Sequence, residues 1–423
     1  MIAQMMLRKR TKGPMSRSLR QRFMTLYLSA LILSTPSLSI AYDITGDLKL
    51  FHMMSGAPRG LETLGGTSSG ALTSRLVFKH SSGGLKYEAH GLLNALQQES
   101  SGTVFSLSPN LKQAGEALPL SYTAIEDGEA IALFRADRLL LSYEWSQYRL
   151  TLGRQAISFG QGRVFTPLDR VSPFSPASVD REYKPGVDAL RLDGYWGIAG
   201  EWTVIGAQRG DFELDQSVFG AKIRDAFGDW DLALFGLWVG GDQVVGLSTA
   251  GPIGELSLYS DFSYTWRAQS GALAKADLAR GETVPFIRAV LGGDWSWATH
   301  GGGRLNLEFA FLGDGLSASQ SYLSAASDPR LLRGERWLLG QRYLALSAMQ
   351  SLTPLVSGSL AIITNLQDPS TLIGPALAWS ISDEVSAQLG GYLGAGKGLR
   401  NLAPQSELGV LSWLTFVMMS AHY

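Results

Sequence analysis

The chain has 423 residues, of which 45% are hydrophobic and only 17% are charged, with 49 glycines, 11 tryptophans and no cysteine. The charged share lies below the roughly 25% of an ordinary soluble domain. The lack of cysteine excludes disulfides, thiolate metal sites, iron–sulfur clusters and c-type haem attachment. None of the five histidines has the spacing of a zinc motif, so we expect no metal and no cofactor.

Residues 1–41 differ from the rest of the chain. Seven basic residues between Arg8 and Arg22 precede an apolar run over 23–33, and the run is followed by Pro36 and by Ser39-Ile40-Ala41. This order predicts a signal peptide cleaved after Ala41, with translation starting at Met1, Met6 or Met15. A membrane anchor is disfavoured because the apolar run is short. Cleavage leaves 29 basic residues against all 37 acidic ones, a net charge of −8, which argues against nucleic-acid binding.

From residue 42 onward, apolar and polar residues alternate with a period of two. Leu305, Leu307 and Phe309, for example, are interleaved with Arg304 and Glu308. Such alternation predicts strands with one apolar and one polar face. About eighteen segments show the pattern, near 43–54, 70–80, 84–94, 130–145, 148–157, 186–196, 201–209, 216–226, 229–239, 243–250, 254–267, 285–297, 303–313, 341–352, 355–366, 371–381, 385–394 and 407–423.

The connections between these segments alternate between short and long. Tight turns at 81–84, 146–147 and 353–354 are separated by long loops such as 95–128, 158–185 and 314–340. Transmembrane barrels have this rhythm, with short periplasmic turns, long outer loops and an even number of strands. We therefore predict an all-β fold, namely an antiparallel up-and-down transmembrane barrel of about eighteen strands formed by residues 42–423.

The last predicted strand ends on an aromatic residue. Trp413, Val417, Met419 and Tyr423 fall on one face of it. This pattern resembles the terminal signal by which Gram-negative outer-membrane barrels are recognised by the barrel-assembly machinery. We expect this strand to pair with the first one and so close the sheet.

The polar phase of each strand predicts the lining of the lumen. Twelve basic and seven acidic residues fall in this phase, and a basic lining favours anions because charged side chains set pore selectivity. Mixed charge that serves only to hydrate the lumen remains an alternative. The basic residues chosen as lining candidates are Lys49, Arg75, Lys79, Arg138, Arg149, Arg191, Lys222, Arg224, Arg288 and Arg304.

The segment 158–185 is unusually rich in proline and charge. Its prolines restrict the backbone and its glycines permit tight bends, which together predict an ordered loop. We expect it to fold into the lumen as a constriction or a lid. An ordered external loop braced by its own salt bridges is the alternative. The candidate residues in and beside this loop are Arg154, Arg163, Asp169, Arg170, Asp180, Arg181, Glu182 and Lys184.

The same stretch carries a family resemblance. Gly153-Arg154-Gln155, then Phe159-Gly160 and Pro167-Leu168-Asp169, resemble a pattern of the alginate-export and related porin-like barrels of Gram-negative outer membranes. The resemblance implies a single barrel with a charged, often basic lumen for anionic solutes. It covers less than a tenth of the chain and implies no particular solute.

Together these features predict an exported outer-membrane channel of a Gram-negative bacterium that passes small, anionic, hydrophilic solutes. Its expected partners are outer-membrane lipid, the assembly machinery and the solute. The sequence does not specify the oligomeric state. Two alternatives stay open, a hydrolase built into the barrel wall around His90 and Glu88, and a sheath or scaffold barrel without an open pore. A nucleophile for the hydrolase is not identified, so we expect no enzyme.

Overall fold

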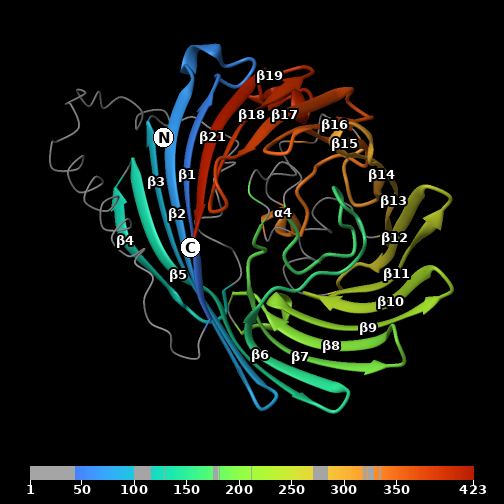
Figure 1. Ribbon diagram of the computed structural model, residues 1–423. Coiled ribbons are helices and arrows are strands. Elements are labelled where there is room, and N and C mark those ends of the chain that lie inside the picture. The colour runs from blue at the N-terminus through green and yellow to red at the C-terminus, as the bar shows by residue number, and fades with distance from the viewer. Residues whose placement is uncertain are drawn as a thin grey trace, which may run out of the picture. The chain divides into compact units, whose positions relative to one another are not determined.

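The computed structural model contains a closed barrel over Asp43–His422. Eighteen antiparallel strands follow one another around the wall, and the last, β21, pairs with the first, β1. Figure 1 shows this circuit from blue β1 to red β21. The structure describes residues 43–99, 116–127, 129–174, 180, 182–210, 212–269, 284–317, 322, 328–332 and 335–423. The predicted signal peptide, residues 1–41, and Arg181 lie outside these residues.

The strands of the wall lie close to the predicted segments. They are β1 (Asp43–Ser55), β2 (Thr67–Ser82), β3 (Leu85–Glu99), β5 (Ala130–Trp145), β6 (Tyr148–Gln155), β7 (Val187–Trp196), β8 (Gly200–Gln208), β9 (Ser217–Phe227), β10 (Trp230–Val239), β11 (Asp242–Ile253), β12 (Leu256–Trp266), β13 (Phe286–Trp297), β14 (Gly303–Leu312), β15 (Arg342–Thr353), β16 (Val356–Asn365), β17 (Ser370–Ser380), β18 (Val385–Ala395) and β21 (Trp413–His422).

Smaller elements lie in the connections. The described part of the chain has a one-turn helix α4 (Pro329–Leu332), the short strands β4 (Ser121–Asp127), β19 (Leu399–Arg400) and β20 (Ala403–Pro404), and four 3₁₀ turns, η1 (Glu62–Leu64), η2 (Leu214–Gln216), η3 (Thr299–Gly301) and η5 (Leu408–Val410).

The wall has an apolar outer face and a more polar inner face. Leu247 and Phe262 lie opposite each other on β11 and β12 and remain 37% and 41% exposed. Their neighbours Ser248 and Asp261, which point the other way, are only 2% and 1% exposed. A closed sheet can lie in lipid because its backbone groups are hydrogen-bonded between neighbouring strands. Its exposed apolar side chains then contact the acyl chains.

Aromatic rings gather at both rims of the apolar face. At the rim with short turns, here called the short-turn end, Tyr143, Trp145, Tyr148 and Trp202 form a continuous series of ring contacts. Tyr264 and Trp266 are in contact at the opposite, long-loop end of β12. Such aromatic girdles occupy the two interfaces of a membrane.

The last strand has the predicted orientation. Trp413, Val417 and Met419 of β21 are 39%, 45% and 47% exposed, while Leu414 and Phe416, on the opposite face, are buried. Tyr423 follows the strand and is 44% exposed. The strand begins at Trp413 rather than near 407, because residues 408–410 form the turn η5.

The sequence did not predict β4. Strand β6 ends at Gln155, which leaves the long-loop part of β5 without a neighbour on that side. Residues 121–127 pair with 130–135 there, so β4 covers an edge that would otherwise expose unpaired backbone groups. The stretch reads as loop because the segment is short and has no clear alternation.

No helix in the described part of the chain is long and apolar enough to cross a membrane.

Candidate functional site

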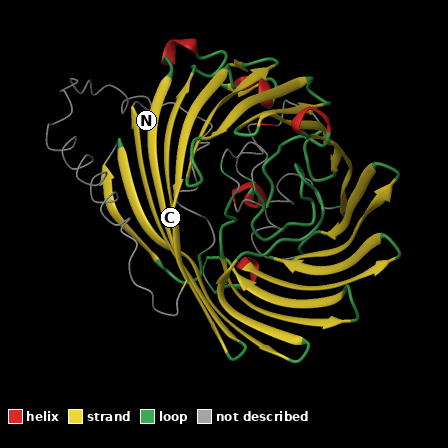
Figure 2. Cartoon of the chain, in the orientation of Figure 1, coloured by secondary structure: helices red, strands yellow, loops and turns green. Residues whose placement is uncertain are grey.

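The described residues of the loop between β6 and β7, namely 156–174, 180 and 182–186, lie inside the ring of strands. Figure 2 shows green loop segments within the barrel. Phe159 packs edge-on against Phe235 of β10, with ring centroids 5.7 Å apart, and Phe165 packs against Tyr343 of β15 at 5.9 Å. Both phenylalanines are buried. The loop therefore contacts inward-facing side chains on two separate parts of the wall.

The tip of this loop is bound by its backbone. The amides of Gln161 and Gly162 donate to Asp261 of β12 at 3.0 Å. The amides of Arg163, Val164 and Phe165 donate to Glu308 of β14 at 2.5 to 3.1 Å. Backbone N–H groups that converge in this way form a concave anion site, here filled by carboxylates of the wall.

Arg170 is the centre of a buried ion network. Its guanidinium lies 3.2 Å from Asp242 and 2.9 Å from Glu335, and all three side chains are completely buried. Arg209 also pairs with Glu335, and Arg330 with Asp242, at 2.9 and 2.8 Å. The network joins the β6–β7 loop, the β10–β11 turn and the loop that follows β14.

Arg288 continues this network along β13. It forms a bidentate contact with Asp314 at 2.5 and 2.8 Å, and Arg336 pairs with Asp328 at 2.9 Å. These two arginines hold the pKa of the Asp314 carboxyl well below its usual range, although burial acts against them. Arg288 is 2% exposed, so it stabilises a loop instead of facing water.

The β7 end of the loop is fixed by Lys184. Its ammonium contacts Asp169 and the Ile157 carbonyl, and Arg138 donates to the Lys184 carbonyl. Burial raises the pKa of the Asp169 carboxyl and lowers the pKa of the Lys184 ammonium, while the attraction between the two groups acts against both shifts.

Lys49 of β1 forms ion pairs with two further charged residues near the β7 end of the loop, Asp180 and Glu182. Its ammonium lies 2.8 Å from Asp180 and 2.6 Å from Glu182. Lys49 itself is 3% exposed, whereas the two acids keep 29% and 41% of their side chains exposed. The loop thus replaces water around a buried lysine.

A β-bulge in β5 turns three charged residues toward the lumen. The register with β3 shifts between His90 and Gly91, so that Asp137 has no partner across the pair. Arg135, Asp137 and Arg138 are all buried as a result. Bulges re-aim side chains in this way. The sequence predicted only Arg138 as inward, because regular alternation cannot place Arg135 and Arg138 on one face.

Arg75 completes this cluster. It lies 2.7 Å from Asp137, and its guanidinium stacks over the ring of Tyr183 at 4.1 Å. His90 lies 3.2 Å from Arg75 and 2.8 Å from Glu88. Within the described part of the chain, the polar side chains in contact with His90 are Arg75 and Glu88, and its ring lies edge-on to that of Tyr183 at 5.9 Å. No serine lies among these contacts, so the hydrolase alternative gains no support.

Arg154 lies outside the loop contacts. It forms a bidentate pair with Asp188 of β7 at 2.9 Å and donates to the carbonyls of Leu118 and Ala136. The amides of Ala117 and Leu118 donate to the same Asp188. The pair therefore ties the segment before β4 to the rim of β6 and β7, and it does not project toward the loop tip.

Arg163 and Arg304 differ from these buried groups. They lie 3.4 and 2.7 Å from the same carboxylate oxygen of Asp294, which is only 6% exposed, yet they keep 48% and 47% of their own side chains exposed. Arg163 also lies over the ring of Tyr259, 5.3 Å from its centroid. One buried carboxylate thus holds two exposed guanidinium groups, and the trio carries a net charge of +1.

Other basic candidates line the short-turn end. Arg149 pairs with Glu144 at 2.6 Å, and Arg224 with Asp231 at 2.8 Å. Arg191 remains 28% exposed beside Asp193, of which 1% is exposed, and Lys222 pairs with Glu201 at 2.9 Å. Lys79 is exposed near the end of β2. In each of these ion pairs the basic side chain is the more exposed partner.

The inner face is charged on one side only. The inner faces of β1–β3 and β5–β14, here called the charged wall, carry the charged strand residues discussed above. The inner faces of β15–β18 and β21, here called the neutral wall, present residues such as Met349, Ser359, Ala376 and Gly390, which lie opposite one another on successive strands. Met349 lies directly opposite Arg304 in the pairing of β14 with β15.

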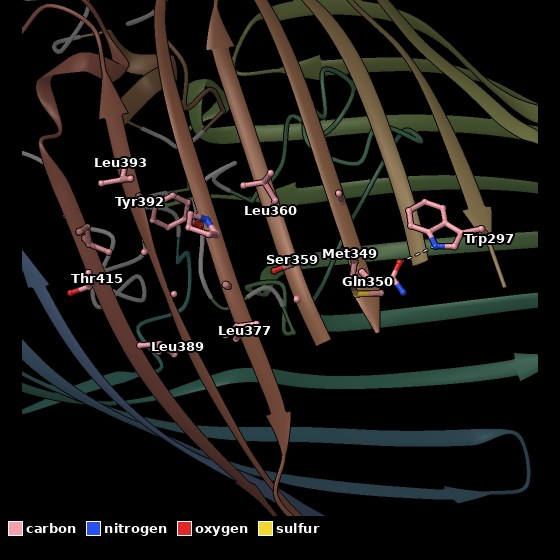
Figure 3. Close-up of a pocket in the computed structure, with 17 residues that line it drawn as sticks. Trp297, Met349, Gln350, Ser359, Leu360, Leu377, Leu389, Tyr392, Leu393 and Thr415 are labelled. Carbon is pink, nitrogen blue, oxygen red and sulfur yellow. Dashed lines mark hydrogen bonds between the residues drawn. The ribbon is translucent and has the colours of Figure 1, made fainter. Parts of the chain in front are cut away.

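Figure 3 shows strands from this part of the barrel. A cavity of about 680 Å³ extends from Trp297 to Thr415, and none of its lining residues is charged. Most of these residues, such as Leu377, Leu389 and Leu393 at 48%, 55% and 52% exposure, have the phase of the outer face, so the cavity lies mainly on the outer side of these strands. Trp297 donates to Gln350 at 2.9 Å, the hydrogen bond drawn there. No group of three or more His, Cys, Asp or Glu residues able to hold a metal occurs within the described ranges.

Comparisons with known proteins show the same barrel. No protein-family model and no curated protein matches the sequence. Three similar solved structures are OccAB1 of Acinetobacter baumannii (11% identity, TM-score 0.54, 90% of this chain and 96% of that one), OpdK of Pseudomonas aeruginosa with vanillate (10%, 0.52, 90% and 98%) and a BenF-like porin of Pseudomonas fluorescens Pf-5 (11%, 0.54, 90% and 98%). At such low identity the likeness establishes the fold. The predicted antiparallel barrel of about eighteen strands is confirmed.

Proposed function

We propose that this protein is an outer-membrane channel that passes small anionic solutes through a hydrated lumen. The observation that supports it best is the pair Arg163 and Arg304, both half-exposed and both in contact with the buried Asp294. A permeating ion meets the two guanidinium groups before it meets the carboxylate. Fixed charges that line a pore select ions of opposite sign, so this arrangement favours anions.

The other ion pairs of the short-turn end act in the same direction. Because Arg149, Arg191 and Arg224 are more exposed than their acidic partners, their charge is felt more strongly in the lumen. The buried arginines around Arg170 contribute little, since each is neutralised at contact distance. We therefore assign the anion selectivity to the exposed basic residues. The buried arginines hold the loops in place, and the β6–β7 loop forms the constriction.

The membrane setting follows from the outer face. Its exposed apolar residues and aromatic rims require lipid, and we propose export by the 1–41 signal peptide and insertion by the barrel-assembly machinery, which would read Trp413, Val417, Met419 and Tyr423. The OpdK structure named above contains vanillate, a small organic anion. A small organic anion is accordingly the solute class we propose here.

Liposome swelling tests the proposal. Liposomes containing the purified mature protein should swell faster in an isotonic solution of a small sugar acid than in one of a neutral sugar of matched size. Equal rates would remove the anion preference and leave a general pore. The absence of swelling in either solution would contradict a channel and favour the sheath or scaffold alternative.

A further inference from the structure

Five consecutive backbone amides at the tip of the β6–β7 loop all donate to side-chain carboxylates of the wall. Those of residues 161 and 162 bind Asp261, and those of residues 163 to 165 bind Glu308. Hydrogen bonds to an ionised acceptor are roughly twice as strong as neutral ones. Two acids on strands β12 and β14 therefore fix the backbone on both sides of Arg163.

Both carboxylates are withdrawn from the solute path. Asp261 is 1% exposed and Glu308 is completely buried. Neither forms an ion pair among the described residues, and their other partners are the hydroxyls of Ser248 and Tyr259, each at 2.6 Å. Carboxylates buried without a cation need several donors, and here the loop tip supplies most of them.

The same contacts orient the side chain of Arg163. Tyr259 donates its hydroxyl to Glu308 and receives a hydrogen bond from Asn306, which holds the ring in place beneath the Arg163 guanidinium. Glu308 thus fixes both the backbone of Arg163 and the ring on which its guanidinium rests. From there the guanidinium reaches Asp294, which also pairs with Arg304.

We infer that Glu308 and Asp261 are positioning residues for anion selectivity, because they hold the loop tip where Arg163 faces the permeating solute. This inference rests on the proposed function. It gives two acids a role that favours anions, although their own charge would favour cations.

That opposition of sign makes the inference testable. If Glu308 acted only through its charge, removing that charge would raise the anion preference. If Glu308 acts by positioning Arg163, the variant E308Q should lower the preference, because an amide group replaces one acceptor with a donor that faces the loop amides. The readout is the anion-to-cation permeability ratio, taken from the reversal potential of single channels in a salt gradient.

Three comparison variants sharpen the experiment. D231N removes an inward carboxylate that touches no loop amide, so it should raise the anion preference. G162A changes no charge, but an added Cβ would overlap the carbonyl oxygen of Phe165 and displace the tip, so it should lower the preference as E308Q does. R163Q removes the side chain that is positioned and should lower it most.

The double variant E308Q/R163Q gives the decisive result. We expect it to match R163Q alone, because a loop tip without its arginine has nothing to position. An additive effect, or a rise in anion preference in E308Q, would overturn the inference. If E308Q does not fold, D261N and G162A carry the same test. An unchanged ratio in R163Q would instead contradict the proposed function, which keeps the two failures distinct.

Discussion

The charged wall and the neutral wall belong to one barrel but are built for different tasks. On the charged wall, buried carboxylates and arginines such as Asp242, Arg288 and Glu308 hold two inward loops by ion pairs and amide contacts. On the neutral wall, strands β15–β18 and β21 include a single Asp, Glu, Lys or Arg, the terminal Arg342. The contrast teaches that charge in this lumen serves mainly to anchor loops.

It follows that the number of lumen charges is a poor guide to selectivity. Arg170 and Arg163 lie seven residues apart in one loop, but Arg170 is completely buried between two acids while Arg163 is half-exposed. A charge that is paired and buried is largely cancelled at the path of the solute. The charges that remain exposed, rather than the total number of charges in the lumen, should determine which ions pass.

The largest effect is expected from reversing a buried charge on the charged wall. R170E would place a third carboxylate beside Asp242 and Glu335 with no water to screen it. Breaking a buried ion pair costs about 3–5 kcal/mol, and the new repulsion adds to this. We expect R170E to lose the folded, heat-resistant form on gel electrophoresis, whereas R163E should keep it. An R170E barrel as stable as the parent would show that the network does not brace the loops.

The next largest effect concerns the exposed side chains of the same wall. R163E changes the local charge by two units at roughly 6 Å from a passing ion, which in water raises the energy of an anion by about 1.4 kcal/mol and lowers that of a cation by about as much. The anion-to-cation permeability ratio should therefore fall about a hundredfold. R163K should retain most of the parent ratio. Reversal potentials in a salt gradient measure both, and equal ratios for R163E and R163K would exclude Arg163 from the path.

A charge added to the neutral wall should leave the barrel folded and should change its ion selectivity. Ser359 points inward and is exposed, and its neighbours across the pairing are Met349 and Ala376. S359D introduces one unit of charge, which we expect to lower the anion-to-cation permeability ratio about tenfold, while S359N serves as the uncharged control. Failure of S359D to fold would mean that the neutral wall lacks the water contact we assign to it.

The smallest effect is expected at Lys79, which is exposed on β2 near the short-turn end. There solvent and salt screen its charge, so K79Q should lower the ratio by about twofold or less at physiological ionic strength. The effect should grow when the salt concentration is reduced. A salt-independent change would indicate that Lys79 acts through a specific contact.

The sequence predicts the wall far better than it predicts the interior. Alternation places Leu247 and Phe262 outside and Asp261 inside, because a closed sheet in lipid imposes that periodicity on every strand. It cannot place Arg135, whose direction depends on the bulge at Asp137. Nor can it pair Arg170 with Glu335, because that contact joins two loops distant in sequence and leaves no periodic trace.

The reversal potential of the unaltered protein in a planar bilayer is the most direct test of the central claim. With a potassium chloride gradient across the membrane, the account predicts single channels whose reversal potential lies on the chloride side of zero. A potential on the potassium side would contradict it, since Arg163 and Arg304 could not then be the charges that a passing ion meets.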